Sequence, residues 1–298
     1  MPPLPVSAVV VNLDGGDLLA RALDALEGEA VDEIVVVDNG SGAGEVSRLA
    51  SRPGLRLLSL PENLGFAAPA NLGAREARAP FVAFVNNDCV VGPGYLAACL
   101  AVLEDHPGLA AVQGLVLTGD GAAVDGRGIG WNARAEAIQL GRGEFPPGPG
   151  GEPFEVPGVS ATASLFRRDL FLSAGGFAES FFAWYEDVDL ALRLRRAGAC
   201  FASVPEARAF HAGRRPAGAI PRSGGVASSR TVSEPSGATS IRPPFRPFTP
   251  VAPRRAPLSA PPRPSSAGRA PFGRPSPPGP PPAPSRRRTA RSSSPSPP

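Results

Sequence analysis

In Phe81-Val82-Ala83-Phe84-Val85-Asn86-Asn87-Asp88 an unbroken apolar run ends abruptly on two amides and a carboxylate, and this pattern indicates the architecture of the chain. An apolar run of five residues without alternation is typical of a strand that is buried on both faces of a sheet. The same pattern predicts strands at Val6–Val11 and Ile34–Val37, which are followed directly by Asn12 and Asp38. We therefore expect several buried strands that each end on a polar side chain.

Helix signals alternate with these strands through the first 120 residues. Repeated strand–helix units predict an α/β fold with a mostly parallel central sheet that is covered on both faces. Ligands of such sheets bind beyond the carboxyl ends of the strands, so Asn12, Asp38 and Asp88 are expected on one rim. The further predicted elements are a helix capped by Asp17, helices over residues 45–51 and 66–78, a helix with Pro93 in its first turn that runs to Asp105, and strands at Leu55–Leu60 and Ala111–Leu117.

The second half of the sequence is less regular. Residues 119–155 are rich in glycine and predict a mobile loop. The segment Tyr185-Glu186-Asp187-Val188-Asp189-Leu190 packs three carboxylates into four positions after an aromatic run, and it is expected to open a helix that ends near Arg196. The remaining predictions are strand-like order from Glu155 to Phe166, a short helix from Arg168 to Ala174, a strand at Cys200–Val204 and the segment Ala209–His211.

Charge divides the chain near Gly213. Residues 213–298 contain 15 Arg, one acid and 23 Pro, whereas residues 1–212 contain 15 Arg and 26 acids. The basic part has too few large apolar residues to offset the entropy cost of ordering, so it is predicted to be a disordered tail. The chain has no Lys, which suggests a GC-rich coding sequence. Since GC-rich DNA read in a shifted frame yields Pro, Arg, Ser and Ala, the tail is interpreted as such a product or as a low-complexity extension. The pI of 9.1 comes from the tail and does not indicate a nucleic-acid partner.

Several protein classes are excluded by what the sequence lacks. A dinucleotide dehydrogenase would carry Gly-x-Gly-x-x-Gly after the first strand, where this chain has Asn12-Leu13-Asp14-Gly15-Gly16. A P-loop enzyme needs a Lys, which this chain lacks. A nucleotidyltransferase would carry a basic, Gly-rich signature early in the chain, and none is present. The N-terminus does not resemble a signal peptide, no apolar run is long enough to span a membrane, and the three Cys suggest reduced thiols in the cytosol.

Six motifs follow one another along the chain at the expected points of the strand–helix alternation. They are Val9-Val10-Val11-Asn12, Val36-Val37-Asp38-Asn39-Gly40-Ser41, Pro61-Glu62-Asn63-Leu64-Gly65-Phe66-Ala67, Asn86-Asn87-Asp88, Gly175-Gly176-Phe177 and Tyr185-Glu186-Asp187-Val188-Asp189-Leu190. Together they resemble the family 2 inverting glycosyltransferases of the GT-A fold, most closely the bacterial rhamnosyltransferase-like branch. The resemblance covers about residues 5–212 and departs from the family in two ways. Asn86 stands where the usual metal motif begins with Asp, and the Pro/Arg tail replaces further helical sequence after His211.

The resemblance implies a metal site and a nucleotide site. Asp88 is expected to hold Mg²⁺ or Mn²⁺, which stabilises the charge of a departing nucleoside diphosphate. His211 is expected to be a second metal ligand or a hydrogen-bond donor to the diphosphate. The alternative is a strand-end Asp that caps a turn and a His with a purely structural role. The residues implied in nucleotide binding are Asn12, Asp38, Asn39, Asn63, Asn87 and Asp88, although a simple turn explains the motifs at 38–41 and 63–65 equally well.

Asp187 is the predicted general base, because an inverting transfer needs one carboxylate to take the proton of the acceptor hydroxyl. Glu186 is assigned to acceptor binding or to support of that base. Asp189 is expected only to pair with Arg193 four residues later. The aromatic residues Phe182, Trp184 and Tyr185 either line the acceptor subsite or belong to the core, and at least one is expected in the core.

Taken together, the sequence predicts metal-dependent transfer of a sugar, with inversion, from a nucleoside diphosphate donor to a hydroxyl of a growing surface glycan or lipid-linked acceptor. The donor is expected to be dTDP-rhamnose or a UDP-sugar. A cytoplasmic location is expected, with peripheral association at the inner face of the plasma membrane as a further hypothesis. The alternative is a truncated or catalytically dead nucleotide-binding remnant with an Arg-rich interaction tail.

Overall fold

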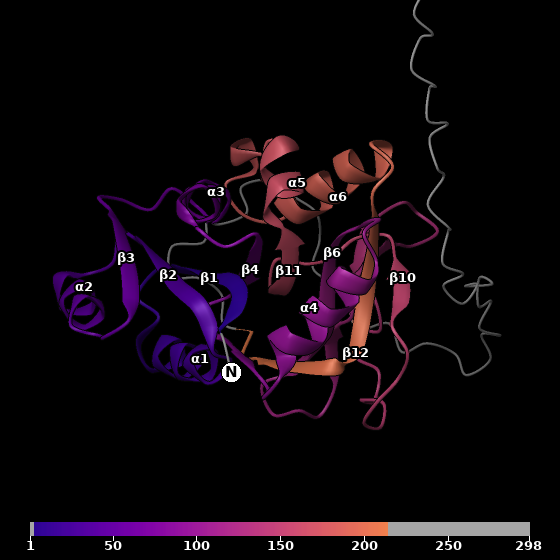
Figure 1. Cartoon of the computed structure of the whole chain (residues 1–298), viewed down its shortest axis with the longest axis horizontal. Helices are drawn as coiled ribbons and strands as arrows, with labels where there is room; N and C mark the ends of the chain where they lie inside the picture. The colour runs from indigo at the N-terminus through magenta and orange to yellow at the C-terminus, as the bar shows by residue number, and fades with distance from the viewer. Residues whose placement is uncertain (1–2, 214–298) are drawn as a thin grey trace, which may run out of the picture. The chain divides into compact units, whose positions relative to one another are not determined.

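A computed structural model describes residues 3–213 of the 298. The predicted disordered tail therefore lies, except for Gly213, outside the described residues. Within residues 3–213 a ten-stranded mixed sheet runs in the order β10-β12-β6-β11-β4-β1-β2-β3, with β5 and β7 paired off this path (Figure 1). The strands of this sheet are β1 Leu4–Asn12, β2 Val31–Asn39, β3 Leu55–Leu60, β4 Phe81–Val85, β5 Cys89–Val91, β6 Leu109–Thr118, β7 Val124–Gly126, β10 Phe154–Val156, β11 Ala163–Arg167 and β12 Cys200–His211.

The half of the sheet that contains β4, β1, β2 and β3 is parallel. β1 pairs with both β2 and β4, and β2 pairs with β3, always in parallel. β11 is antiparallel to β4 and to β6, and β12 runs parallel to β6. The expected strand–helix alternation is present, so the carboxyl ends of β1, β2 and β4 meet at one edge of the sheet.

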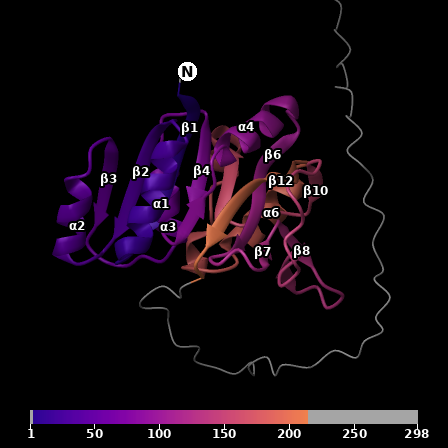
Figure 2. The ribbon, with the colours of Figure 1, turned by 90° about the horizontal axis from the view of Figure 1, so that it is seen from below.

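Helices cover both faces of the sheet (Figures 1 and 2). Successive residues of β1 point to opposite faces, so that Ala8 and Val10 pack in the layer of α1 (Gly16–Gly28) and α4 (Tyr95–Asp105), whereas Val9 packs in the opposite layer. In that second layer Phe84 contacts the rings of Phe171 and Phe177 at centroid distances of 5.0 and 5.1 Å. The helices are α1 Gly16–Gly28, α2 Ala43–Ala50, α3 Ala67–Glu76, α4 Tyr95–Asp105, α5 Arg168–Ser173 and α6 Glu186–Arg196, with a 3₁₀ turn η1 at Glu179–Phe181.

Two predicted helix starts are wrong in detail. Gly15 is the N-cap of α1, so Asp17 lies inside the first turn, where its charge still favours the positive end of the helix dipole. Pro93 precedes α4, whose N-cap is Gly94 with φ 75°. In both places a glycine is the N-cap of the helix. Asp17 therefore lies after its predicted capping position, and Pro93 lies before its predicted position in the first turn.

The glycine-rich segment 119–155 contains more order than the sequence predicts. β7 pairs with β6, and a separate hairpin joins β8 Ile129–Trp131 to β9 Ala137–Gln139. The strand-like stretch predicted from Glu155 to Phe166 is two strands, β10 and β11, with a loop between them. Short strands escape prediction here because their partners, and not their own sequence, hold them in place.

The end of the described chain is also joined differently. β12 runs without a break from Cys200 to His211, where the sequence predicts a strand and a separate segment. An irregularity between Val204 and Arg208 lets the strand keep its pairing with β6 and then pair with β5. No helix among residues 3–213 is long and apolar enough to cross a membrane.

Candidate active site

The polar side chains at the ends of β1, β2 and β4 form one hydrogen-bonded cluster, here called the rim network (Asn12, Asp38, Ser41 and Asn87). The Asn12 amide donates to Asp38 Oδ1 at 3.1 Å and accepts from Asn87 Nδ2 at 3.0 Å. The Ser41 backbone N–H donates to Asp38 Oδ2 at 3.1 Å. The three strand ends therefore meet on one rim as expected, and their side chains hold each other in position.

Burial limits what the rim network can touch. Asn12 is 0% exposed and Asp38 is 1% exposed, and both oxygens of the Asp38 carboxylate already accept hydrogen bonds. In this structure Asn12 and Asp38 are buried below the rim and support it through their hydrogen bonds. A direct contact of Asn12, Asp38 or Asn87 with a nucleotide stays a prediction.

Asn39 and Asn63 build the loop that follows β3. Asn39 Nδ2 donates to Asn63 Oδ1 at 2.9 Å and to the Gly65 carbonyl at 2.7 Å, and its Oδ1 accepts from the Leu64 N–H at 2.9 Å. Asn63 Oδ1 also accepts from the Gly65 N–H. The polar atoms of Asn39 are therefore engaged in fixing residues 63–65, and nucleotide binding by Asn39 and Asn63 stays a prediction.

Asp88 and His211 come together although they are 123 positions apart in the sequence. His211 closes β12 opposite Cys89 of β5, so that its Nε2 lies 3.2 Å from Asp88 Oδ1. The Nδ1 of the same ring lies 2.8 Å from Asp125 Oδ2. The structure thus brings Asp88 and His211 together, and their role as metal ligands stays a prediction. Asp125 is a residue that sequence reasoning missed.

Charge and burial act in opposite directions on His211. Burial lowers the pKa of the imidazole, but the hydrogen bonds and charges of Asp125 and Asp88 outweigh it and raise the pKa to about 9. The His211 hydrogen bond lowers the pKa of Asp125. The ring therefore bridges two carboxylates as a cation when nothing else binds there.

A signal in the sequence could have located Asp125. The dipeptide Asp120-Gly121 is a strong hairpin signal between two apolar stretches. A hairpin at this point pairs β7 with the end of β6, and β6 lies beside β12. Treating residues 119–155 as one loop hid this pairing and with it the carboxylate next to His211.

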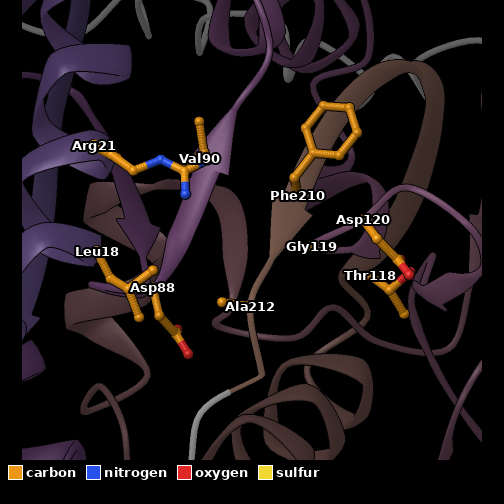
Figure 3. Close-up of a pocket in the computed structure, with 9 residues that line it drawn as sticks. All are labelled: Leu18, Arg21, Asp88, Val90, Thr118, Gly119, Asp120, Phe210 and Ala212. Carbon is orange, nitrogen blue, oxygen red and sulfur yellow. The ribbon is translucent and has the colours of Figure 1, made fainter.

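Asp88 also borders a hollow of about 450 Å³. Leu18 and Arg21 of α1 line it on one side, and Phe210 of β12 and Asp120 line it on the other (Figure 3). The carboxylate of Asp88 projects from the strand end at its border, as Figure 3 shows. Asp88 is therefore reachable from solvent although little of its surface is exposed.

The second acidic group lies in the first turn of α6. Asp187 Oδ1 accepts from the Val188 N–H at 2.8 Å and Oδ2 accepts from the Ala161 N–H at 3.4 Å. Burial raises the pKa of Asp187, and these hydrogen bonds oppose that shift. Leu190 and Ala191, on the same helix, are buried in the core and fix the backbone that carries the carboxylate.

Glu186 differs from its neighbour in having an unsatisfied oxygen. It is 6% exposed, and its Oε2 has no hydrogen-bond partner among the described residues. Burial, and then the charge of Asp187, raise the pKa of Glu186 to about 8. Asp189 behaves as predicted, since its Oδ2 lies 2.8 Å from Arg193.

The aromatic residues before α6 lie in an unusual backbone. Phe182, Trp184 and Tyr185 all have positive φ, at 60°, 68° and 69°. Trp184 and Tyr185 are 56% and 58% exposed, so neither belongs to the core, and Phe182 is half-buried. The Phe182 carbonyl accepts from the Phe66 N–H at 2.6 Å and from the Ala67 N–H at 3.2 Å. The start of α3 therefore anchors this segment.

The fold and the site define a class of protein: an α/β domain with carboxylates at strand ends and a second acidic group at the start of a late helix. The glycosyl transferase family 2 profile matches residues 7–173, and the chain belongs to that family. N-acetylglucosaminyl-diphospho-decaprenol L-rhamnosyltransferase of Mycobacterium tuberculosis is 32% identical over 233 residues, which cover 70% of this chain and 75% of that relative. The O-antigen biosynthesis protein RfbC of Myxococcus xanthus is 28% identical over 72% of this chain and 18% of its own length.

Solved structures agree on the fold. GalNAc-T7 with UDP, GalNAc and Mn²⁺ superposes with a TM-score of 0.58 at 17% identity and covers 69% of this chain and 43% of its own. The mannosyltransferase PcManGT from Pyrobaculum calidifontis, in complex with GDP-Man and Mn²⁺, gives 0.53 at 19% identity and covers 72% and 59%. The predicted GT-A fold and the predicted resemblance to rhamnosyltransferases are confirmed, and the chain is a glycosyltransferase.

Proposed function

We propose that this glycosyltransferase is an inverting, metal-dependent enzyme that transfers a sugar from a nucleoside diphosphate donor, and that residues 1–212 form its catalytic domain. The observation that carries the proposal is the pairing of Asp88 with His211 at the strand ends of a family 2 domain. The donor we favour is dTDP-rhamnose, with a UDP-sugar as the other candidate. The similarity to a relative named as a rhamnosyltransferase supports rhamnose.

The donor set fits a divalent cation. Asp88 Oδ1 and His211 Nε2 lie 3.2 Å apart, and two adjacent ligands of an octahedral cation at about 2.1 Å are separated by about 3 Å. One carboxylate oxygen and one imidazole nitrogen, completed by waters and phosphate oxygens, suit Mn²⁺ better than the harder Mg²⁺. When bound, the cation would neutralise charge on the diphosphate leaving group.

Asp187 is the proposed general base. It takes the proton of the acceptor hydroxyl while the hydroxyl oxygen forms a bond to the anomeric carbon, on the face opposite the departing nucleoside diphosphate. The bond between the anomeric carbon and the phosphate oxygen breaks, and the configuration at that carbon inverts. A raised pKa brings Asp187 closer to the neutral range in which a base is effective.

Asp187 suits this role better than Glu186. The N–H groups of Val188 and Ala161 favour the ionised form of Asp187, whereas Glu186 Oε2 has no such donor among the described residues and its pKa of about 8 keeps it protonated at neutral pH. Glu186 is therefore proposed to contact the acceptor or to support the base. The acceptor we propose is a hydroxyl of a glycan carried on a lipid, at the cytoplasmic face of the membrane, because the name of the relative specifies a decaprenol-linked sugar.

The substitution Asp187→Asn tests this assignment. It keeps the size of the side chain and one oxygen that can accept from the Val188 N–H, but it removes the base, so transfer should fall about 10²–10⁴-fold. Affinity for the donor nucleotide, measured by calorimetry, should change less than about twofold, because the base acts on the acceptor. Asp189→Asn, in the same turn and paired with Arg193, is the matched control and should retain transfer.

Two outcomes would contradict the assignment. Wild-type turnover in Asp187→Asn would rule out Asp187 as the base. Nucleotide binding without any transfer in the wild-type chain, across dTDP-rhamnose and UDP-sugars with lipid-linked acceptors, would instead support the catalytically dead alternative.

A further inference from the structure

His211 lies between two carboxylates that come from different parts of the chain. Its Nε2 faces Asp88 Oδ1 at 3.2 Å, and its Nδ1 faces Asp125 Oδ2 at 2.8 Å. Asp88 is the strand-end carboxylate already described, whereas Asp125 lies on β7 and has no part in the proposed chemistry. The arrangement raises the question of what the second carboxylate does.

The chemistry of a metal-bound imidazole answers it. A histidine can bind a cation through Nε2 only if that nitrogen has lost its proton, and the remaining proton must then be held on Nδ1. An acceptor facing Nδ1 fixes this tautomer and the orientation of the ring, and it also makes the ligand nitrogen more basic. Asp125 Oδ2 is in the position such an acceptor needs.

We propose that Asp125 is a positioning residue that holds His211 with its proton on Nδ1 and its Nε2 directed toward Asp88 and the bound cation. This inference rests on the proposed metal-dependent function. It gives a defined role to the glycine-rich segment, which brings the carboxylate to the metal site from outside the predicted motifs.

The surroundings of Asp125 preset its carboxylate. β7 pairs with β6 on one side. On the other side the Val124 N–H donates to the Glu144 carbonyl at 2.9 Å and the Gly143 N–H donates to the Val124 carbonyl at 2.8 Å. Val124 is buried, which anchors the short strand. The neighbours of Asp125, Val124 and Gly126, are thus paired, and they fix the backbone that carries the carboxylate.

The two oxygens of Asp125 have separate partners. Oδ2 accepts from His211, and Oδ1 lies 3.5 Å from the guanidinium of Arg142, whose side chain is 69% exposed. An exposed ion pair of this length contributes little. The contact with His211 is therefore the one that determines where the carboxylate points.

The experiment uses the full-length chain with MnCl₂ as the probe and observes the two histidines of this sequence by NMR. Mn²⁺ broadens the signals of nuclei close to it. His106 precedes β6 and His211 aligns with Thr118 at the other end of that strand, so by strand rise the two rings are roughly 30 Å apart. His211 signals should therefore disappear at low Mn²⁺ while His106 signals remain as an internal reference.

Three variants separate positioning from folding. Asp125→Ala removes the acceptor, and the Mn²⁺ concentration that broadens His211 should rise about 10–100-fold. Asp125→Asn retains an oxygen that can accept from Nδ1, so it should recover a large part of the wild-type affinity. Glu144→Gln changes a carboxylate of the same segment that pairs with Arg127, and it should behave as wild type. Thermal melting of each variant checks that the fold is kept.

The outcomes distinguish the positioning role of Asp125 from the existence of the metal site. If the wild-type chain binds Mn²⁺ at His211 and Asp125→Ala binds it equally well, the positioning role is overturned and the metal site stands. If Mn²⁺ does not broaden His211 in the wild-type chain, the metal site itself is overturned and the role of Asp125 falls with it. Loss in Asp125→Ala, recovery in Asp125→Asn and no change in Glu144→Gln is the result we expect.

Discussion

The two sides of the candidate site are built in opposite ways. On the strand-end side, the buried polar atoms of Asn12, Asp38 and Asn39 bond to one another and to the backbone. On the side formed by the start of α6, Glu186 has a buried oxygen without a partner among the described residues, and Trp184 is largely exposed. On the first side the polar atoms of Asn12, Asp38 and Asn39 have partners without a ligand, whereas the second side presents groups that a ligand could satisfy. We interpret the first as the preorganised donor side and the second as the acceptor side.

Gly65 is where the two sides touch, and its replacement should have the largest effect. It has φ 80°, and a Cβ built there would lie 2.3 Å from the Phe182 carbonyl oxygen. Gly65→Ala must therefore push the segment before α6 away from the start of α3. Backbone strain and overpacking together should cost about 3 kcal/mol of unfolding free energy, measured by urea denaturation.

Gly54→Ala is the matched control for that substitution. Gly54 has φ 73°, but a Cβ at this position meets nothing within 4 Å. It should therefore show only the backbone part of the loss, about 1 kcal/mol. Equal losses in the two variants would mean that the contact between Gly65 and Phe182 does not join the two sides.

The contribution of Glu186 to the free energy of unfolding should fall as the pH rises. The folded-state pKa of Glu186, about 8, lies above its usual value of 4.5. Its contribution to stability is therefore fully present below pH 4.5 and is lost as the pH rises toward 8. Between about pH 5 and pH 7.5 the wild-type chain should lose on the order of 2 kcal/mol relative to Glu186→Gln, which stays neutral throughout.

Thermal melting of the two proteins across this pH range measures that difference. Groups that do not interact with Glu186, His211 included, titrate alike in both proteins and cancel in the comparison. Parallel stability curves for wild type and Glu186→Gln would show that Glu186 is not a neutral, buried group. The distinction between the two sides would then lose its main support.

Substitutions on the donor side should mainly lower the free energy of unfolding. Asn39→Ala leaves the Leu64 N–H without its acceptor and releases the loop at residues 63–65. The expected cost is about 1–2 kcal/mol, or a fall in Tm of several degrees. Glu62→Gln, an exposed change in the same loop, should leave Tm unchanged. An Asn39→Ala protein with the wild-type Tm would show that the loop does not depend on this side chain.

The sequence reveals those parts of the site that local patterns specify. Apolar runs mark β1, β2 and β4, and the polar residues that follow them, Asn12, Asp38 and Asp88, reach one rim because parallel strands end together. The helix that carries Asp187 is likewise found, and its bounds agree with the structure. At these positions the local sequence pattern predicts the same element that the tertiary structure contains.

What escapes the sequence depends on pairing between distant segments. Asp125 reaches His211 only because β7 adds to β6. Asp120-Gly121 marks the turn between these strands, but the three residues of β7 do not by themselves indicate a strand or its partner. The burial of Glu186 and the engagement of Asn39 with residues 63–65 depend on neighbours supplied by the fold. Residue type and spacing indicate that these groups are polar, but not which of them remain available to a ligand.

The metal-dependent donor site can be tested by a thermal-shift screen of the full-length chain against UDP, dTDP, GDP and ADP, each with and without MnCl₂. The screen is then repeated with Asp88→Ala. A ligand at about 100 times its dissociation constant adds about 2.7 kcal/mol, which corresponds to several degrees. We predict that dTDP or UDP stabilises the wild-type chain only when Mn²⁺ is present, and that Asp88→Ala abolishes the shift. Stabilisation by a nucleotide that needs no metal and survives Asp88→Ala would contradict the metal-dependent donor site.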